Sequence, residues 1–136
     1  MVTMTVHAKI RPFLMFEGKA EEAMNFYVSL FPGSEITELA RYGPDEAGAE
    51  ASVKLAAFTI GGENVLCTDS FVHHGFTFTP AISFFVSCES DEEVRPLAAA
   101  LSEGGSVFMP VGEYGFSRLF AWVSDRFGVS WQLNFE

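Results

Sequence analysis

The sequence predicts an α+β fold made of two similar modules, each with the element order βαβββ. Two observations indicate it. Strand-like and helix-like hydrophobic patterns follow one another in the same order in both halves of the chain, and the halves align when one is shifted by 71 residues. This shift pairs Phe13 with Phe84, Glu21-Glu22 with Glu92-Glu93, Leu30 with Leu101, Gly33 with Gly104 and Ile36 with Val107.

The repeat also predicts how the modules are joined. A repeated unit of this length cannot bury its apolar face alone, so two copies must pack together. The length of 136 residues suits one domain. We therefore expect a single domain, 1–136, with modules at 9–68 and 79–136, in which a curved mixed sheet surrounds a shared cleft.

The first module begins with a β-rich run at 9–16, in which Pro12 favours a sheet edge or a bulge. Residues 20–31 then follow the spacing of an amphipathic helix, which Pro32-Gly33 ends. The apolar stripe of that helix is Ala23, Phe26, Tyr27, Leu30 and Phe31. Strands are expected at 35–42, 52–60 and 64–68, with a tight turn at Gly61-Gly62.

An aromatic connector, 69–78, leads to the second module. A strand is expected at 81–86, and a helix then begins after Ser90, with Glu93 completing a capping box. Pro96 lies inside this helix and predicts a kink or a short first turn, because proline removes a helical hydrogen bond. Gly104-Gly105 ends the helix, and the closing strands are expected at 106–111, 118–124 and 130–135.

Charge and composition narrow the classes of partner. The formal net charge is −10 and only eight residues are Lys or Arg, so binding to nucleic acid or to an anionic membrane surface is not expected. No apolar stretch approaches the roughly 20 residues of a membrane span, and the N-terminus lacks a signal-peptide pattern. We expect a cytoplasmic protein in which Cys67 and Cys88 are free buried thiols rather than a disulfide.

Common catalytic motifs are missing from the sequence. There is no GxSxG, HExxH or GxxxxGK[ST] pattern. His7 lies before the first strand, and the adjacent His73 and His74 point to opposite faces of an extended segment, so all three histidines are expected at the surface or as capping groups. The 15 phenylalanines indicate a thick aromatic core or an apolar pocket, and the core is the simpler explanation.

Three segments resemble the vicinal oxygen chelate superfamily, and more narrowly its PhnB-like branch, often labelled demethylubiquinone methyltransferase-like. They are PFLMFEGKAEEAMNFYVSLFPGSEI at 12–36, SCESDEEV with the following LSEGG within 87–105, and WVSDRFGVSWQLNF at 122–135. The resemblance implies a glyoxalase/bleomycin-resistance-like fold and a homodimer. It does not fix an activity, because function depends on the site residues and not on the fold.

Metal-dependent members of this superfamily hold a divalent ion with His and Glu side chains on the first and last strand of each half. The corresponding positions here carry Arg11 or Pro12, then Cys67 or Thr68, then the segment 81–83, and finally Gln132. An arginine, a small neutral residue and an amide do not form a site for a hard cation. The resemblance therefore implies no metal and no other cofactor.

The methyl transfer in the branch's label is not expected either. The usual S-adenosylmethionine site lies in a Rossmann-like parallel sheet with a Gly-rich first loop. A repeated βαβββ module does not build such a sheet. We interpret the label as a name rather than as a description of chemistry.

The predicted cleft is the candidate binding site. Its concave face takes one alternating set from the first strand, either Phe13 with Met15 or Leu14 with Phe16, and we favour the Phe13 set. Aromatic residues of later strands are expected to complete the face, namely Phe58, Trp122 and Trp131, although a tryptophan in a strand such as Trp131 is also a common core residue.

Three polar residues are added to this site. Arg11 either holds a carboxylate or phosphonate or pairs with one of the acidic residues, and Gln132 is the second polar candidate. Cys67 lines the site and acts as a nucleophile only if a cationic neighbour lowers its pKa.

Small-molecule binding in an aromatic cleft without the usual metal centre is the function that we expect. Two alternatives stay open: a metal-dependent lyase, isomerase or dioxygenase of the same superfamily, and a resistance protein that sequesters a cationic drug. Metal analysis of the purified protein separates the first alternative from binding alone, and salt-sensitive binding of a cationic drug identifies the second.

Overall fold

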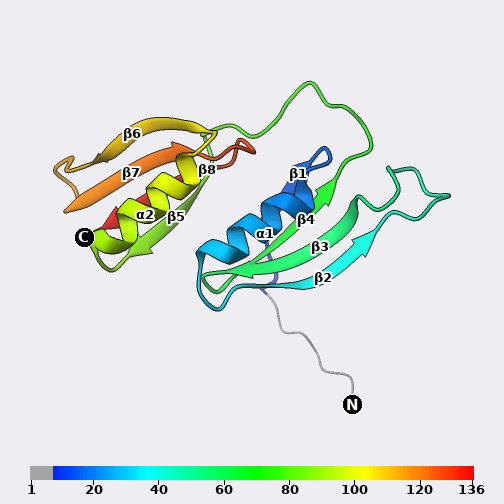
Figure 1. The fold of residues 1–136 in the computed structure, drawn as a ribbon, viewed down its shortest axis with the longest axis horizontal. Coiled ribbons are helices and arrows are strands. Elements are labelled where there is room, and N and C mark those ends of the chain that lie inside the picture. Colours follow the sequence, from blue (N-terminus) through cyan, green and yellow to red (C-terminus); the bar gives the residue numbers. More distant parts are fainter. Residues whose placement is uncertain (1–7) are drawn as a thin grey trace, which may run out of the picture. The chain divides into compact units, whose positions relative to one another are not determined.

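The computed structural model describes residues 8–136, and the chain divides after Gly75 into two compact units. Each unit contains one helix and one four-stranded mixed sheet (Figure 1). The predicted α+β class with two βαβββ modules is therefore confirmed. The module limits 9–68 and 79–136 within one domain, and the shared cleft, stay predictions.

The first unit contains β1 (Phe13–Phe16), α1 (Ala20–Leu30), β2 (Glu35–Arg41), β3 (Val53–Ile60) and β4 (Glu63–Asp69). Its sheet has the order β1-β4-β3-β2, and only the β1–β4 pair is parallel. The first strand is shorter than predicted. Pro12 has no N–H to donate, and its carbonyl oxygen accepts from the Leu66 N–H at 2.9 Å just before β1 begins.

The second unit contains β5 (Ser83–Cys88), α2 (Asp91–Ser102), β6 (Ser106–Gly112), β7 (Leu119–Ser124) and β8 (Ser130–Phe135). Its sheet has the order β5-β8-β7-β6, again with one parallel pair, β5–β8. The order is that of the first unit strand for strand, which is the signature of a duplicated module (Figure 1).

The predicted capping box begins α2. The Ser90 hydroxyl oxygen accepts from the Glu93 N–H at 3.2 Å, and the Glu93 carboxylate accepts from the Glu89 N–H at 2.8 Å. Pro96 lies within the helix, on its exposed side, and the helix continues through it to Ser102. The first turn is not shortened, because the capped residues ahead of the proline already fix it.

The two units also share a local irregularity. A register shift occurs between Ile36 and Glu38 in β2, and another between Val107 and Met109 in β6, at the positions that the shift of 71 residues pairs. Both sheets are therefore irregular at the same point of the repeat.

The predicted pairing of Phe13 with Phe84 is wrong. Three residues separate β1 from α1, but only two separate β5 from α2, so the strands are out of step by one residue. The structural partner of Phe13 is Phe85, and both side chains are similarly exposed, at 58% and 59%. Phe84 instead packs against Trp131, with ring centroids 4.8 Å apart.

Each sheet has one face covered by the helix of its own unit. In the first unit the buried residues include Met24, Tyr27, Val53, Phe58 and Val65, and in the second they include Val94, Leu101, Val123, Trp131 and Leu133. These apolar side chains alternate along the strands, as a sheet with one covered face requires. Among the described residues, no helix of the same unit covers the opposite face of either sheet.

The structure describes both cysteines and the connector between the two modules. Cys67 and Cys88 are free and buried, as predicted.

The start of the connector is bound to the turn after β1. The Glu17 carboxylate contacts the His73 ring at 2.9 Å and accepts from the His74 N–H at 3.2 Å. These bonds, the His73 ring first, lower the pKa of Glu17. His7 lies outside the described residues.

Within residues 8–136, neither helix is long and apolar enough to cross a membrane. The cytoplasmic location and the homodimer stay predictions.

Gly105 lies where the end of α2 approaches β7. An added Cβ would come within 1.9 Å of the Ser124 carbonyl oxygen and 2.7 Å of the Asp125 carbonyl carbon, both backbone atoms that cannot turn aside. We expect Gly105→Ala to destabilise the second unit by roughly 2–3 kcal/mol, as overpacking of a rigid site does. Urea unfolding monitored by tryptophan fluorescence measures this, and Gly75→Ala, where the added Cβ meets nothing within 4 Å, is the control.

Candidate functional site

The face of the second sheet opposite α2 carries the candidate site. Side chains alternate along each strand, so the residues that share this face with Phe85 are fixed by the register of β5, β7 and β8. One row across the sheet contains Phe85, Gln132 and Trp122, and the next contains Ser83, Ser130 and Ser124. We call the face defined by Ser83, Phe85, Trp122, Ser130 and Gln132 the binding face.

A chain of hydrogen bonds joins four of these side chains. The Trp122 indole Nε1–H donates to the Ser130 hydroxyl oxygen at 2.9 Å. The Ser130 and Ser83 hydroxyl oxygens are 2.6 Å apart, and Gln132 Nε2 donates to the Ser83 hydroxyl oxygen at 3.4 Å. The chain fixes the orientation of the indole and of the amide on the surface of the sheet.

Aromatic rings border this polar chain. The Phe108 and Trp122 ring centroids are 5.0 Å apart, in a tilted arrangement. Phe85 is 59% exposed and Phe108 is 41% exposed. Large aromatic rings at this degree of exposure offer apolar surface to a flat ligand, while the polar chain supplies direction.

A loop closes one end of the binding face. Phe120 lies two residues from Trp122 on β7, yet it is buried, because Tyr114 and Phe116 from the loop 113–118 pack on it at 6.1 and 4.9 Å between ring centroids. The Tyr114 hydroxyl donates to the Pro110 carbonyl oxygen at 2.6 Å and holds the loop in place.

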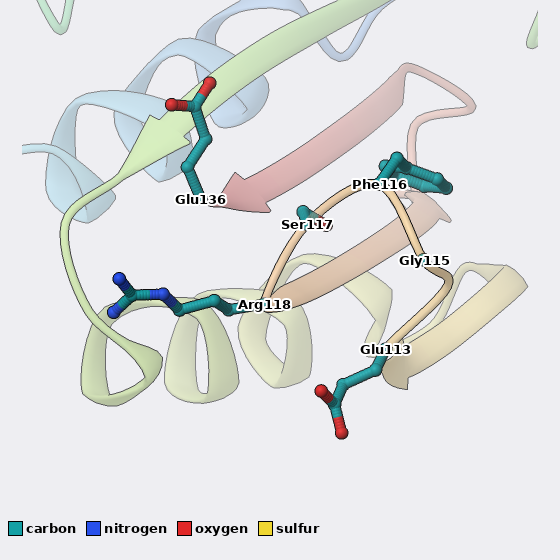
Figure 2. A pocket seen from close by; sticks show the side chains of 6 residues that line it. All are labelled: Glu113, Gly115, Phe116, Ser117, Arg118 and Glu136. Carbon is teal, nitrogen blue, oxygen red and sulfur yellow. The ribbon is translucent and has the colours of Figure 1, made fainter.

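The same loop borders a hollow of about 730 Å³, lined by Glu113, Gly115, Phe116, Ser117, Arg118 and Glu136. Figure 2 shows that the three charged side chains extend away from one another rather than toward one centre. The Arg118 guanidinium lies 5.3 Å from the centre of the Phe135 ring. With no convergent polar groups, this hollow is a weaker candidate than the binding face.

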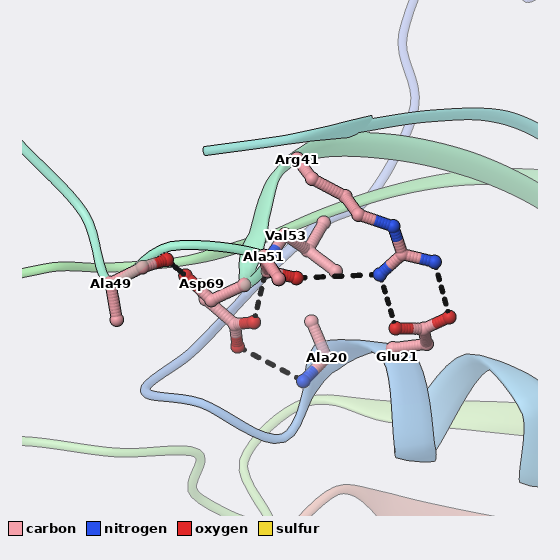
Figure 3. Close-up of polar contacts among 8 residues, drawn as sticks. Ala20, Glu21, Arg41, Ala49, Ala51, Val53 and Asp69 are labelled. Carbon is pink, nitrogen blue, oxygen red and sulfur yellow. Dashed lines mark hydrogen bonds and ion pairs between the residues drawn. The ribbon is translucent and has the colours of Figure 1, made fainter. Parts of the chain in front are cut away.

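A buried carboxylate organises the first unit. Asp69, 3% exposed, accepts three backbone N–H groups: Gly18 at 2.8 Å, Ala20 at 3.0 Å and Val53 at 3.0 Å. Figure 3 shows the bonds from Ala20 and Val53. Lys19, the residue at the N-cap of α1, makes no side-chain capping bond, so Asp69 supplies the cap from β4. This arrangement is structural.

Trp122 and Gln132, both predicted for the site, are brought together as cross-strand neighbours on the binding face. Trp131 lies on the other face, in the core under α2, and its indole Nε1–H donates to the Asp125 carboxylate at 2.9 Å. The core alternative for Trp131 is therefore the one that the structure has.

The predicted residues of the first unit are divided between two faces of its sheet. Phe13 is on the exposed face, whereas Phe58 and Cys67 lie in the core beneath α1, where Phe58 stacks on Tyr27 at 6.3 Å. Strand alternation separates them: Phe13 pairs with Leu66, and Cys67 is the next residue of β4. Arg11 is half-buried ahead of β1, and in the described part of the chain it has no ion pair.

The Cys67 thiol is not activated. Burial, with a further contribution from the Asp69 carboxylate, raises the pKa of Cys67 to about 12. The thiolate needed for nucleophilic attack is therefore nearly absent at neutral pH. This is the opposite of the cationic environment on which a nucleophilic role depended.

Four residues of the binding face and its border were not predicted: Ser83, Phe85, Ser130 and Phe108. Only the register of β5 against β8 shows that Ser83 and Ser130 face each other, and a sequence shift of 71 residues misplaces β5 by one position. Among residues 8–136, no three His, Cys, Asp or Glu side chains gather as a metal site would require.

Comparisons with known proteins match nearly the whole chain. The family described as 3-demethylubiquinone-9 3-methyltransferase matches residues 8–134. A solved PhnB protein from Bacillus cereus is 51% identical, with a TM-score of 0.92 over 95% of this chain and 100% of that chain. Protein YjdN of Escherichia coli (strain K12) is 24% identical over 144 residues, 92% of this chain and 93% of that protein.

A more distant structure shows the fold alone. The glyoxylase/bleomycin resistance protein/dioxygenase domain from Frankia sp. EAN1pec is 12% identical, with a TM-score of 0.62 over 96% of this chain and 93% of that domain. This likeness agrees with the fold that the sequence predicts.

Proposed function

The chain belongs to the family described as 3-demethylubiquinone-9 3-methyltransferase, the PhnB-like branch of the vicinal oxygen chelate superfamily, and we propose that it binds a small molecule with a flat apolar body. The binding face of the second sheet is the site. Phe85, Phe108 and Trp122 contact the body of the ligand, and the hydrogen-bond chain below them orients its polar group.

The internal duplication supports this proposal. In the first unit, the row that corresponds to Phe85, Gln132 and Trp122 consists of Phe13, Leu66 and Ala57. A four-stranded sheet of the same order thus forms with an apolar row and no amide or indole. The polar chain of the second sheet is not required by the fold, which supports a role in recognition.

Methyl transfer, which the family's description names, is not part of the proposal. S-adenosylmethionine is usually held at the end of a parallel sheet, by a Gly-rich loop that leads into a helix. Each sheet described here has one parallel pair only, β1–β4 or β5–β8, and the turn before each helix is short. The described residues do not fit that cofactor, and the binding face needs none.

The two tryptophans provide an internal control for a binding experiment. The chain contains only two, Trp122 on the binding face and Trp131 in the core, so ¹H–¹⁵N NMR shows two indole N–H resonances. We expect titration with 2-acetonaphthone, a flat bicyclic ketone, to move the Trp122 resonance saturably and to leave that of Trp131 in place. Phe85→Ala should weaken binding about fivefold, the value of one aromatic contact.

Val107→Ala is the matched control. Val107 is 53% exposed on β6 but shares a row with Val123, on the α2 side of the sheet. Its replacement should leave the affinity within twofold. A Trp122 resonance that does not move, or that moves no more than that of Trp131, would show that this face does not bind flat apolar molecules.

A further inference from the structure

The hydrogen-bond chain of the binding face has a defined direction. Ser130 is 1% exposed, and in the described part of the chain its hydroxyl contacts two polar partners, Trp122 Nε1 and Ser83 Oγ. The indole N–H is a donor only, so it cannot accept the Ser130 proton. A buried hydroxyl left without an acceptor is costly. Ser130 therefore accepts from Trp122 and donates to Ser83.

This direction leaves Ser83 with a proton to offer. Its hydroxyl oxygen already accepts from Ser130 at 2.6 Å and from Gln132 Nε2 at 3.4 Å, which occupies both of its lone pairs. Within residues 8–136 no acceptor is bonded to the Ser83 O–H, and Ser83 is half-buried at the edge of the group of hydrogen-bonded side chains. The Ser83 O–H is thus a donor available to a ligand.

Gln132 provides the complementary group. Its Nε2 is directed to Ser83, so its carbonyl oxygen Oε1, which lies in the same amide plane on the other side of Cδ, points away from Ser83. No donor among the described residues is bonded to that oxygen. Gln132 is half-buried beside Phe85 and Trp122. One donor and one acceptor therefore lie next to each other on an aromatic surface.

The binding face also favours an uncharged ligand over a charged one. Its five defining residues, Ser83, Phe85, Trp122, Ser130 and Gln132, are all uncharged. A carboxylate would gain one hydrogen bond from Ser83 and meet the lone pairs of Gln132 Oε1 without a cation to offset its desolvation. A group that carries both an acceptor and an N–H satisfies both side chains at once.

We infer that this face recognises a neutral amide, or a chemically equivalent acceptor–donor pair, attached to a flat apolar body. The ligand's carbonyl oxygen accepts from the Ser83 O–H, and its N–H donates to Gln132 Oε1. The inference rests on the proposed function and adds the chemical class of the ligand's polar group.

Three naphthalene derivatives that share one apolar body test it: 2-naphthamide with acceptor and donor, 2-acetonaphthone with an acceptor only, and 2-naphthoate with a charged carboxylate. We expect 2-naphthamide to bind about fivefold to tenfold more tightly than 2-acetonaphthone, because one further neutral hydrogen bond forms. We expect 2-naphthoate to bind more weakly than both. The Trp122 indole resonance reports each affinity in the full-length protein.

Two variants assign the hydrogen bonds. Gln132→Leu places in β8 the residue that the first sheet carries at the corresponding position, Leu66, so folding should be retained. It should remove the preference for the amide over the ketone, so that the two compounds bind with similar affinity. Ser83→Ala should weaken the amide and the ketone together, whereas Ser87→Ala, two residues along the same face of β5, should weaken neither.

The outcomes separate the two proposals. If none of the three compounds moves the Trp122 resonance, the proposed function itself fails. If all three bind with equal affinity, or if Gln132→Leu keeps the amide preference, the binding face exists and the assignment of an amide to it is wrong.

Discussion

Replacing Asp69 by alanine is expected to lower the free energy of unfolding of the first unit by roughly 3–5 kcal/mol. The Asp69 carboxylate accepts from the N–H groups of Gly18, Ala20 and Val53, and it is nearly inaccessible to solvent. Alanine would leave these donors without an acceptor in a buried site. It would also remove the N-cap of α1, which no residue of the α1 segment itself supplies.

Asp69→Asn should also lower the free energy of unfolding of the first unit, but by less than Asp69→Ala does. The two N–H groups of Gly18 and Ala20 share Oδ1, which an amide oxygen can replace, while the N–H of Val53 faces Oδ2, where the amide would place a second donor. Hydrogen exchange of the α1 amides in urea measures the loss in the first unit, since both tryptophans lie in the second.

Asp45→Ala is the matched control, because Asp45 is an exposed acid in the loop between β2 and β3. It should change the stability by less than about 0.5 kcal/mol, as exposed substitutions do. If Asp69→Ala lowers the free energy of unfolding by no more than the control does, other groups satisfy the three N–H donors.

Asp69 also shows what the sequence conceals. The capping box of α2 was predictable, because Ser90 and Glu93 are three residues apart and the motif is local. The cap of α1 comes from a residue 49 positions away from Ala20, and it leaves no pattern near the helix. The local sequence pattern therefore predicts Asp69 at the start of the connector, although in the structure Asp69 ends β4.

The order of the elements was predictable for a different reason. Hydrophobic period and turn residues are properties of neighbouring positions, and they locate the ten helices and strands of residues 8–136 to within a few residues. Strand pairing is not local. The face on which a strand residue lies depends on register, and an error of one position moves it to the other side of the sheet.

That rule explains the mixed result for the candidate site. Trp122 and Gln132 fall on one face, but Trp131 is the residue before Gln132 in β8 and therefore lies on the other. The same alternation puts Phe58 and Cys67 beneath α1, away from Phe13. Aromatic or polar identity alone did not distinguish these positions, since both faces of a sheet accept aromatic residues.

The second large effect is expected at Asp125, whose replacement by alanine should lower the free energy of unfolding of the second unit by roughly 3–5 kcal/mol. Asp125 is 2% exposed at the end of β7. Its carboxylate accepts from the N–H groups of Phe127 and Val129 at 2.9 and 3.1 Å and from the Trp131 indole at 2.9 Å. It thus fixes the β7–β8 turn and a core side chain together.

The indole bond can be separated from the turn by a double-mutant cycle. Asp125→Asn provides an amide oxygen that can still accept from the two backbone N–H groups, but it places an NH2 donor opposite the indole N–H. Trp131→Phe removes the indole N–H. We therefore expect the cost of Asp125→Asn to fall by about 1–2 kcal/mol when phenylalanine occupies position 131. Urea unfolding followed by far-ultraviolet circular dichroism measures all four proteins without depending on Trp131 emission. Additive losses would show that the carboxylate stabilises the turn alone and not the indole.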